Sequence, residues 1–236
     1  MQYNSHATSQ DCVSEVLKIS GATTNTYPLV DITRRFNGAL DRFFTLAFRS
    51  DGRWNFDDLN QTTAPLESIN LVSGTEKYAI DTFTSEIINV LRVEMLDSTG
   101  KGVVLQPLDR NSVGWESLPQ FNSVAGTPRW YDKLGKYIYL YPKPNYNSTN
   151  GLSLYFERNK SAFVSTDTTK SPGIPSLFHM YLCRLAALPF LIEKSLPQKD
   201  DIASQIQVDE EEIVGYFSHR DKDIQTRIQA KRTNPR

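Results

Sequence analysis

His179 and Cys183 are the two residues whose types and spacing come closest to a metal site. They stand four positions apart, so on a helix they would share a face and present a nitrogen and a sulfur ligand together. Two ligands do not make a zinc site, and no second pair has suitable spacing. We therefore expect a packed cysteine and a hydrogen-bonded histidine, with no metal and no cofactor.

Other arrangements that could carry catalysis are incomplete. Asp57 and Asp58 form an acidic pair, but proton transfer needs a second group at a matched distance. Capping of a turn or of a helix start is the simpler role for them. The chain has three histidines, His6, His179 and His219, and no nucleophile-elbow sequence supports a Ser-His-Asp arrangement. Residues 100–102 lack the spacing of a P-loop. The sequence predicts no catalytic residue.

The amino-acid composition limits the kinds of partner that the protein can bind. The 236 residues include 26 basic and 27 acidic side chains, for a formal net charge of −1. No long-range field therefore draws the whole protein to nucleic acid or to an anionic membrane. The two cysteines form no spaced framework, which indicates a reducing compartment. No segment approaches the roughly 20 apolar residues that a membrane span requires, so we expect a soluble, intracellular protein without membrane contact.

Apolar residues recur at helical spacing towards both ends of the chain. Residues 9–21 and 29–48 are predicted to form amphipathic helices, with Asp31 as the cap of the second. A third helix starts near Pro175 and continues through a kink at Pro189, with an apolar face at Leu177, Phe178, Tyr181, Leu182, Leu185 and Ala186. A last helix covers about residues 200–232. Its narrow apolar stripe suits one packing partner and consists of Ile202, Ile206, Ile213, Phe217, Ile224 and Ile228.

Short apolar alternations between these helices indicate antiparallel strands. We expect one hairpin around Ser73-Gly74-Thr75, which joins residues 69–71 to residues 78–80. A second hairpin joins residues 87–96 to residues 103–108, and a third pairs residues 137–141 with residues 152–156.

This order of periods predicts an α+β fold, in which N-terminal and C-terminal helices form one helical unit and an antiparallel β-domain is inserted between them. The expected boundaries are residues 1–61 for the N-terminal helical part, 62–165 for the β-domain, and 166–236 for the C-terminal helices and a basic tail that pack with residues 1–61.

Several phrases follow one another in a characteristic order. They are Leu40-Asp41-Arg42-Phe43, residues 54–60, Leu71-Val72-Ser73-Gly74, residues 126–131, residues 138–144 and Pro172-Gly173-Ile174-Pro175. Their order and spacing resemble those of the head-to-tail adaptor (connector) proteins of short-tailed bacteriophages. The resemblance covers residues 29–191.

The resemblance implies a non-enzymatic structural protein of the virion, assembled in the host cytoplasm. It implies a homo-oligomeric ring of about twelve copies under the portal protein. This ring would carry the tail tube or nozzle protein and surround the double-stranded genome as it leaves. The alternatives are a glycan-hydrolysing phage protein, suggested by abundant aromatic residues and scattered carboxylates, and a glycan- or nucleic-acid-binding module built on the β-domain.

The tyrosines of residues 137–141 alternate with aliphatic residues, so they lie on one face of the predicted strand. This face could be buried within its own domain. It could equally be buried against a neighbouring subunit, because tyrosine is enriched at interfaces. The candidate subunit interface consists of Trp130, Tyr137, Tyr139 and Tyr141.

Arg35, Arg42 and Arg49 stand seven positions apart on one flank of the long N-terminal helix. One interpretation is a solvated face, in which Asp31 pairs with Arg35. The other is a contact with acidic residues of another subunit or with the phosphates of passing DNA.

The C-terminal segment changes from acidic to basic. Acidic residues 209–212 give way to a group of basic residues, an order that complements the helix dipole. Pro235 cannot continue the helix, so the tail should be extended. Adaptors of the resembled family use terminal extensions to grip the portal, so the candidate portal contacts are Arg227, Lys231, Arg232 and Arg236.

Overall fold

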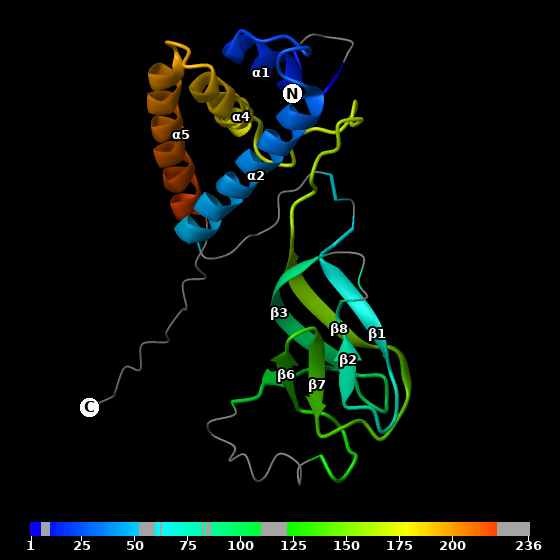
Figure 1. The fold of residues 1–236 in the computed structure, drawn as a ribbon. Helices are drawn as coiled ribbons and strands as arrows, with labels where there is room; N and C mark the ends of the chain where they lie inside the picture. The colour runs from blue at the N-terminus through cyan, green and yellow to red at the C-terminus, as the bar shows by residue number, and fades with distance from the viewer. Residues whose placement is uncertain are drawn as a thin grey trace, which may run out of the picture. The chain divides into compact units, whose positions relative to one another are not determined.

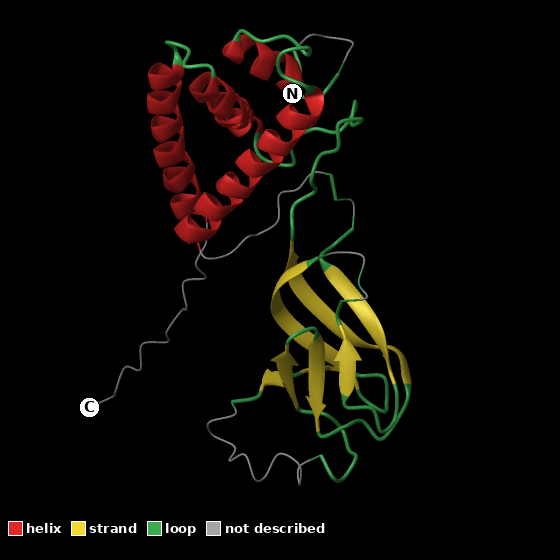
Figure 2. Cartoon of the chain, viewed as in Figure 1, coloured by secondary structure: helices red, strands yellow, loops and turns green. Residues whose placement is uncertain are grey.

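The computed structural model describes residues 1–5, 10–51, 60–61, 63–81, 83, 86–109 and 122–220. The chain divides into two compact units, a helical unit of residues 1–60 with 161–236 and a β-unit of residues 61–160. Helices and strands are segregated between these units (Figures 1 and 2). The predicted α+β fold, with an antiparallel β-domain inserted into a helical unit, is confirmed.

The helical unit contains four described α-helices, α1 (Cys12–Ser20), α2 (Leu29–Asp51), α4 (His179–Glu193) and α5 (Lys199–Arg220), with a short 3-10 helix, η1 (Ser176–Phe178). The helix α1 is closed by two capping signals. The Ser14 N–H donates to the Asp11 carboxylate, and Gly21 adopts a left-handed conformation with φ of 64°. The last predicted helix is confirmed as far as Arg220, and Ile224 and Ile228 lie outside the described residues.

The prediction that Asp31 caps α2 is wrong. The helix begins at Leu29, because the Pro28 carbonyl already accepts hydrogen bonds from the N–H groups of Asp31 and Ile32. Asp31 therefore lies in the first turn, where a carboxylate is favoured by the helix dipole.

The core of the helical unit forms where α1, α2 and α5 pack around α4. The predicted inner stripe of α2 is buried at Ile32, Phe36, Ala39, Leu40, Phe43 and Ala47. The helix α4 packs against α1, α2 and α5, and α2 also packs against α5. The Phe43 ring lies 5.5 Å from that of Phe178 and 5.7 Å from that of Phe217, in geometries that favour aromatic attraction.

Two expectations about the region around helix α4 were wrong. The helix continues through Pro189 as predicted, but Leu177 is 59% exposed and does not belong to its buried face. By length and composition alone, the stretch Ser176–Glu193 could also cross a membrane, contrary to the sequence-based expectation. Half of this stretch is buried, because α4 is the central helix of the unit.

The described residues of the β-unit form two four-stranded sheets. Sheet A has the order β1-β8-β3-β4 and is formed by β1 (Leu66–Leu71), β8 (Ser148–Arg158), β3 (Ile87–Leu96) and β4 (Gly102–Val104). Sheet B has the order β2-β7-β6-β5 and is formed by β2 (Lys77–Ala79), β7 (Tyr137–Tyr141), β6 (Trp130–Leu134) and β5 (Gln106–Pro107). Strand pairing is antiparallel except between β5 and β6.

Only the second predicted hairpin is correct, since β3 pairs with β4. The strands flanking residues 73–75 belong to different sheets, and the Gly74 N–H donates to the Pro144 carbonyl at the crossing between them. The third predicted partner is also wrong. Strand β7 pairs with β6 through the turn at Gly135, which has φ of 58°, while β8 lies in sheet A.

The inward faces of the two sheets form one hydrophobic core. Sheet A contributes Leu71, Val93, Met95, Leu152, Leu154 and Phe156, and sheet B contributes Tyr78, Ile138 and Leu140. Period-2 alternation explains why these residues share a face, since successive side chains of a strand point to opposite sides.

Candidate functional site

Strand register gathers the predicted interface residues on one face of sheet B. Trp130 lies opposite Tyr141 across the β6–β7 pair. Tyr139 is flanked by Asp132 on β6 and by Lys77 on β2. Tyr137 lies opposite Leu134 and Ala79 in the same way. Since directly opposite residues of antiparallel strands project to the same side, these residues form one surface, which we call the aromatic face.

Two lysines lie beside the ring of Tyr137. The Lys77 ammonium lies 3.9 Å from the ring centroid, and the Lys136 ammonium lies 5.6 Å from it. Lys136 also donates to the Asp81 carboxylate at 2.7 Å. That hydrogen bond lowers the pKa of Asp81 and raises the pKa of Lys136. The aromatic face therefore carries positive charge at its Tyr137 end.

The β-unit itself buries only part of the tyrosine strand. Ile138 and Leu140 are fully buried in the core, and Tyr141 is 8% exposed. Tyr137, Tyr139 and Trp130 are half-buried. Burial within the domain thus accounts for the aliphatic residues and Tyr141, whereas the other aromatic side chains leave surface for a further contact.

The arginine row is exposed along α2 at Arg35, Arg42 and Arg49. The predicted pair of Asp31 with Arg35 is wrong in its partner, because the Asp31 carboxylate lies 2.9 Å from the guanidinium of Arg34, three residues on. Arg42 is held by the C-terminal helix. Its Nε donates to Oε1 of Glu210 at 2.9 Å and its Nη2 donates to Oε2 at 2.8 Å.

Glu210 belongs to a polar layer between the helices that sequence reasoning missed. It accepts a hydrogen bond from the hydroxyl of buried Tyr181. The Arg42 hydrogen bond lowers the pKa of Glu210, while burial raises the pKa of Tyr181. A parallel ion pair joins Arg184 of α4 to Asp209 of α5 at 2.6 Å. The sequence did indicate that residues 209 and 210 face the neighbouring helices, because both positions flank the inner apolar stripe of α5.

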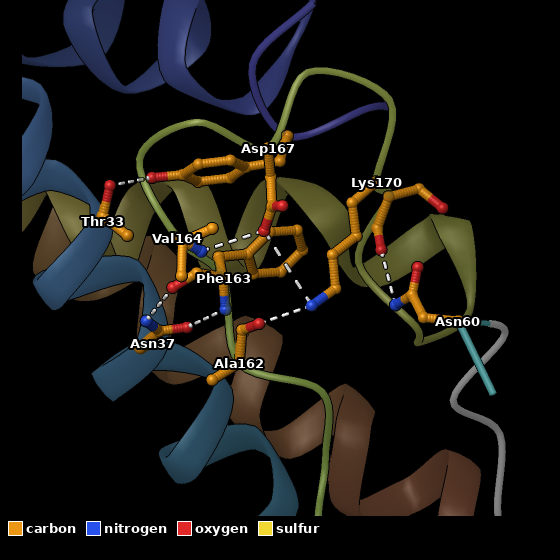
Figure 3. Close-up of polar contacts among 10 residues, drawn as sticks. Thr33, Asn37, Asn60, Ala162, Phe163, Val164, Asp167 and Lys170 are labelled. Carbon is orange, nitrogen blue, oxygen red and sulfur yellow. Dashed lines mark hydrogen bonds and ion pairs between the residues drawn. The ribbon is translucent and has the colours of Figure 1, made fainter.

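A second feature missed from the sequence holds the chain where it re-enters the helical unit (Figure 3). The Asn37 side chain of α2 accepts from the Phe163 N–H at 2.8 Å and donates to the Phe163 carbonyl at 2.9 Å. The Phe163 ring stacks on that of Tyr3 with centroids 4.4 Å apart. Asn60 donates to the Ser171 carbonyl at 2.9 Å. The two Asn37 bonds fix the returning segment to α2, and we call them the Asn37 clamp. Tyr3 and Asn60 hold the same segment from outside α2.

Further bonds within the returning segment shape it. The Asp167 carboxylate accepts from the Val164 N–H at 2.9 Å. Lys170 donates to the Ala162 carbonyl, and its own carbonyl accepts from the Tyr3 N–H at 2.7 Å. The segment is therefore tied both to itself and to the start of the chain, although it contains no helix or strand.

His179 and Cys183 lie on α4, and both are buried. The His179 Nε2 lies 3.1 Å from the Ile174 carbonyl, and its Nδ1 lies 3.0 Å from the amino group of Met1. Burial and the nearby amino group lower the pKa of His179. Within the described ranges, no group of three or more His, Cys, Asp or Glu side chains could hold a metal ion.

The candidate portal contacts Arg227, Lys231, Arg232 and Arg236 lie outside the described residues, as do Asp57, Asp58 and His6.

The helical unit and the two-sheet β-unit, with a half-buried aromatic face, define an α+β protein. The family model described as SU10 adaptor protein matches residues 7–224. The chain belongs to the SU10 adaptor protein family, which identifies it as a phage structural protein of the head-to-tail adaptor kind. No curated protein matches the sequence.

Proposed function

We propose that this protein forms a homo-oligomeric ring that joins the portal protein to the tail tube or nozzle protein and surrounds the path of the double-stranded genome. The observation that carries this proposal is the family match over residues 7–224 of a chain of 236 residues. A ring of about twelve copies follows from the resemblance of the sequence to connector proteins. The function is structural and needs no catalytic site.

The aromatic face is the candidate contact of the β-unit with a neighbouring subunit. Half-buried Trp130, Tyr137 and Tyr139 offer large, rigid rings with a polar tip, which is the composition favoured at protein interfaces. Tyr141 is the structural member of this group, since it is buried within its own unit.

The C-terminal residues Arg227, Lys231, Arg232 and Arg236 are the candidate contacts with the portal. Helix α5 is fixed to the bundle by buried Ile206, Ile213 and Phe217, so it gives the following segment a defined starting point. Exposed Arg35 and Arg49 are the candidate contacts with DNA or an acidic partner. Arg42 is a weaker candidate, because Glu210 already neutralises its charge.

The mass of the protein in solution, alone and after mixing with the portal protein, tests this function. A ring predicts a complex of many copies that co-elutes with the portal. The competing function, a glycan-binding or glycan-hydrolysing protein, predicts a species that stays monomeric with portal but binds or cleaves bacterial surface glycans. That result would exclude the adaptor function and support a glycan-binding or glycan-hydrolysing function.

A further inference from the structure

Helices α2 and α5 each carry a stripe of exposed residues, with Gly215 half-buried, that packs against no other helix or strand among the described residues. At about 100° per residue, Val30, Arg34 and Gly38 fall within about 80° of one another, on the side of α2 opposite buried Phe36. Val208, Glu212 and Gly215 similarly fall within about 60° on the side of α5 opposite buried Ile206. We call these the α2 stripe and the α5 stripe.

The two stripes share an order of residue types. Each begins with an exposed valine, at 69% exposure for Val30 and 56% for Val208. One helical turn later stands a charged residue, basic Arg34 in α2 and acidic Glu212 in α5. A further turn on stands a glycine, Gly38 or Gly215. Aligned in parallel, the stripes place valine beside valine, arginine beside glutamate and glycine beside glycine.

Contacts among the described residues do not require glycine at either position. Neither has a positive φ, and a Cβ built on Gly38 or Gly215 meets nothing within 4 Å. Glycine inside a helix is destabilising relative to alanine. A close approach of another backbone would explain why two exposed helices both accept this cost.

The charges around the stripes are complementary as well. Exposed Asp201, Glu211 and Glu212 make the outer side of α5 acidic. The outer side of α2 carries exposed Arg34, Arg35 and Arg49, and it also carries the exposed acidic residue Asp41, which lies about 20° from Arg34 around the helix. Arg34 is paired with Asp31, but its side chain is 69% exposed. Such an exposed pair contributes little to stability and leaves the guanidinium available to a partner.

The arrangement of the helical unit suits a head-to-tail contact. In Figure 1, α2 and α5 run in the same sense and converge towards their C-terminal ends, so their outer sides face in different directions. Rotation about a ring axis preserves the direction of a helix along that axis, so α2 of one copy and α5 of the next also run in the same sense. A heterologous ring contact needs two different complementary surfaces on each subunit. The two stripes provide them.

We propose that the α2 stripe of one copy packs in parallel against the α5 stripe of the next copy, with Arg34 beside Glu212 and the two glycines at the closest approach of the helices. This inference rests on the proposed ring and names the surface through which its helical units associate. The partner of each stripe is thus a second copy of this chain.

Cysteine cross-linking of the full chain tests the register directly. The double variant V30C/V208C, assembled with the portal and oxidised with copper phenanthroline, should give a ladder of covalent multimers on a non-reducing gel. The matched control is V30C/V214C, because Val214 is an exposed valine on the same helix but on a different side. The control should stay monomeric. Native Cys12 and Cys183 are buried and should not interfere.

Charge exchange provides a second, independent readout. R34E and E212R should each weaken assembly about tenfold or more, and the double variant R34E/E212R should recover most of the loss. K18E makes the same charge change at an exposed lysine on α1 and should have no effect. Replacing Gly38 and Gly215 by alanine should raise the melting temperature by about 2–4 °C per site and still weaken assembly.

Two outcomes separate the hypotheses. If electron microscopy shows rings of the cysteine variants but V30C/V208C cross-links no better than V30C/V214C, or if R34E and E212R assemble normally, the proposed interface is wrong and the ring remains. If the unmodified protein forms no ring with the portal, the proposed function is wrong and the interface falls with it.

Discussion

Arg42 and Glu210, 168 positions apart in the chain, form a two-point ion pair that joins α2 to α5, with nitrogen to oxygen distances of 2.9 and 2.8 Å. Both oxygens of the carboxylate are engaged, and Oε1 also accepts from the Tyr181 hydroxyl. The pair thus links the N-terminal and C-terminal parts of the helical unit to its central helix α4.

Replacing Glu210 by glutamine should destabilise the helical unit by about 1–3 kcal/mol, because Arg42 loses its counter-charge and buried Tyr181 loses a charged acceptor. Chemical denaturation followed by circular dichroism measures this change. R49A removes an exposed arginine from the same helix and should change stability by less than about 0.5 kcal/mol. Equal changes in the free energy of unfolding for the two substitutions would show that the Glu210 contacts do not stabilise the helical unit.

The same pair predicts the direction of a pH effect. The pKa of Glu210 is lowered in the folded protein by the Arg42 hydrogen bond, from an ordinary value of 4.5. Its contribution is therefore complete above pH 4.5 and is lost as the pH falls through the lower folded value. The stability difference between the parent protein and E210Q should shrink below pH 4.5. A difference that grows on acidification would contradict the assignment.

The Asn37 clamp should be a main support of the returning segment. The substitution N37A removes both a donor and an acceptor for the Phe163 backbone and should cost about 1–3 kcal/mol. Hydrogen exchange of the Phe163 amide should accelerate at the same time. The control T45A removes an exposed hydroxyl that bonds only within α2, and it should leave the Phe163 amide protected. Unchanged exchange in N37A would show that the ring of Phe163 holds the segment without Asn37.

The two cysteines should be inert in the folded protein. Cys12 and Cys183 are fully buried on α1 and α4. The contact with the Cys12 side chain and burial raise the pKa of Cys183 well above its ordinary value, so little reactive thiolate forms. A thiol reagent at pH 8 should label neither residue until denaturant unfolds the chain, whereas an exposed V30C thiol should react at once. Fast labelling of the native protein would mean that the α1–α4 packing opens readily.

Tyr139 and Tyr141 should respond differently to replacement by alanine. Buried Tyr141 supports the β-unit, so Y141A should lower its stability by about 2–4 kcal/mol. Half-buried Tyr139 should tolerate the change with a loss below about 1 kcal/mol, but Y139A should weaken ring assembly. Unchanged melting and unchanged assembly in both variants would exclude a structural and an interface role alike.

The basic end of the chain should be needed for the portal but not for folding. A variant that ends at Ala230 loses Lys231, Arg232 and Arg236, and it keeps the described core intact. It should remain soluble and folded, while its binding to portal weakens, more so at high salt because charge-assisted contacts are screened. Full attachment of the truncated protein at both low and high salt would contradict the proposed role of the tail.

Periodic patterns in the sequence predicted the helices and strands of this fold better than they predicted which strands pair with one another. The spacing of Ile32, Phe36 and Phe43 identified the buried side of α2, because a helix repeats within a few residues. The alternation of residues 137–141 likewise separated core from surface. It did not reveal that β7 pairs with β6 and β2, since strand pairing depends on contacts distant in sequence and two of three hairpins were assigned wrongly.

The Asn37 contacts could not be predicted for a related reason. The Asn37 clamp joins one helical side chain to backbone groups of an irregular segment 126 positions away, and no period marks such a pair. Glu210 carried a weak signal, because its place beside the inner stripe of α5 directs it towards α2. The predicted interface residues did gather on one face, because Trp130 and Tyr141 occupy opposite positions of adjacent strands.

The most direct test of the adaptor function is an electron microscopy image of the purified protein incubated with the portal protein of its phage. An adaptor should appear as a second ring stacked on the portal and coaxial with it, with averaged side views that show added density on one side. Portal particles that remain bare at saturating concentrations of the folded protein would contradict the adaptor function.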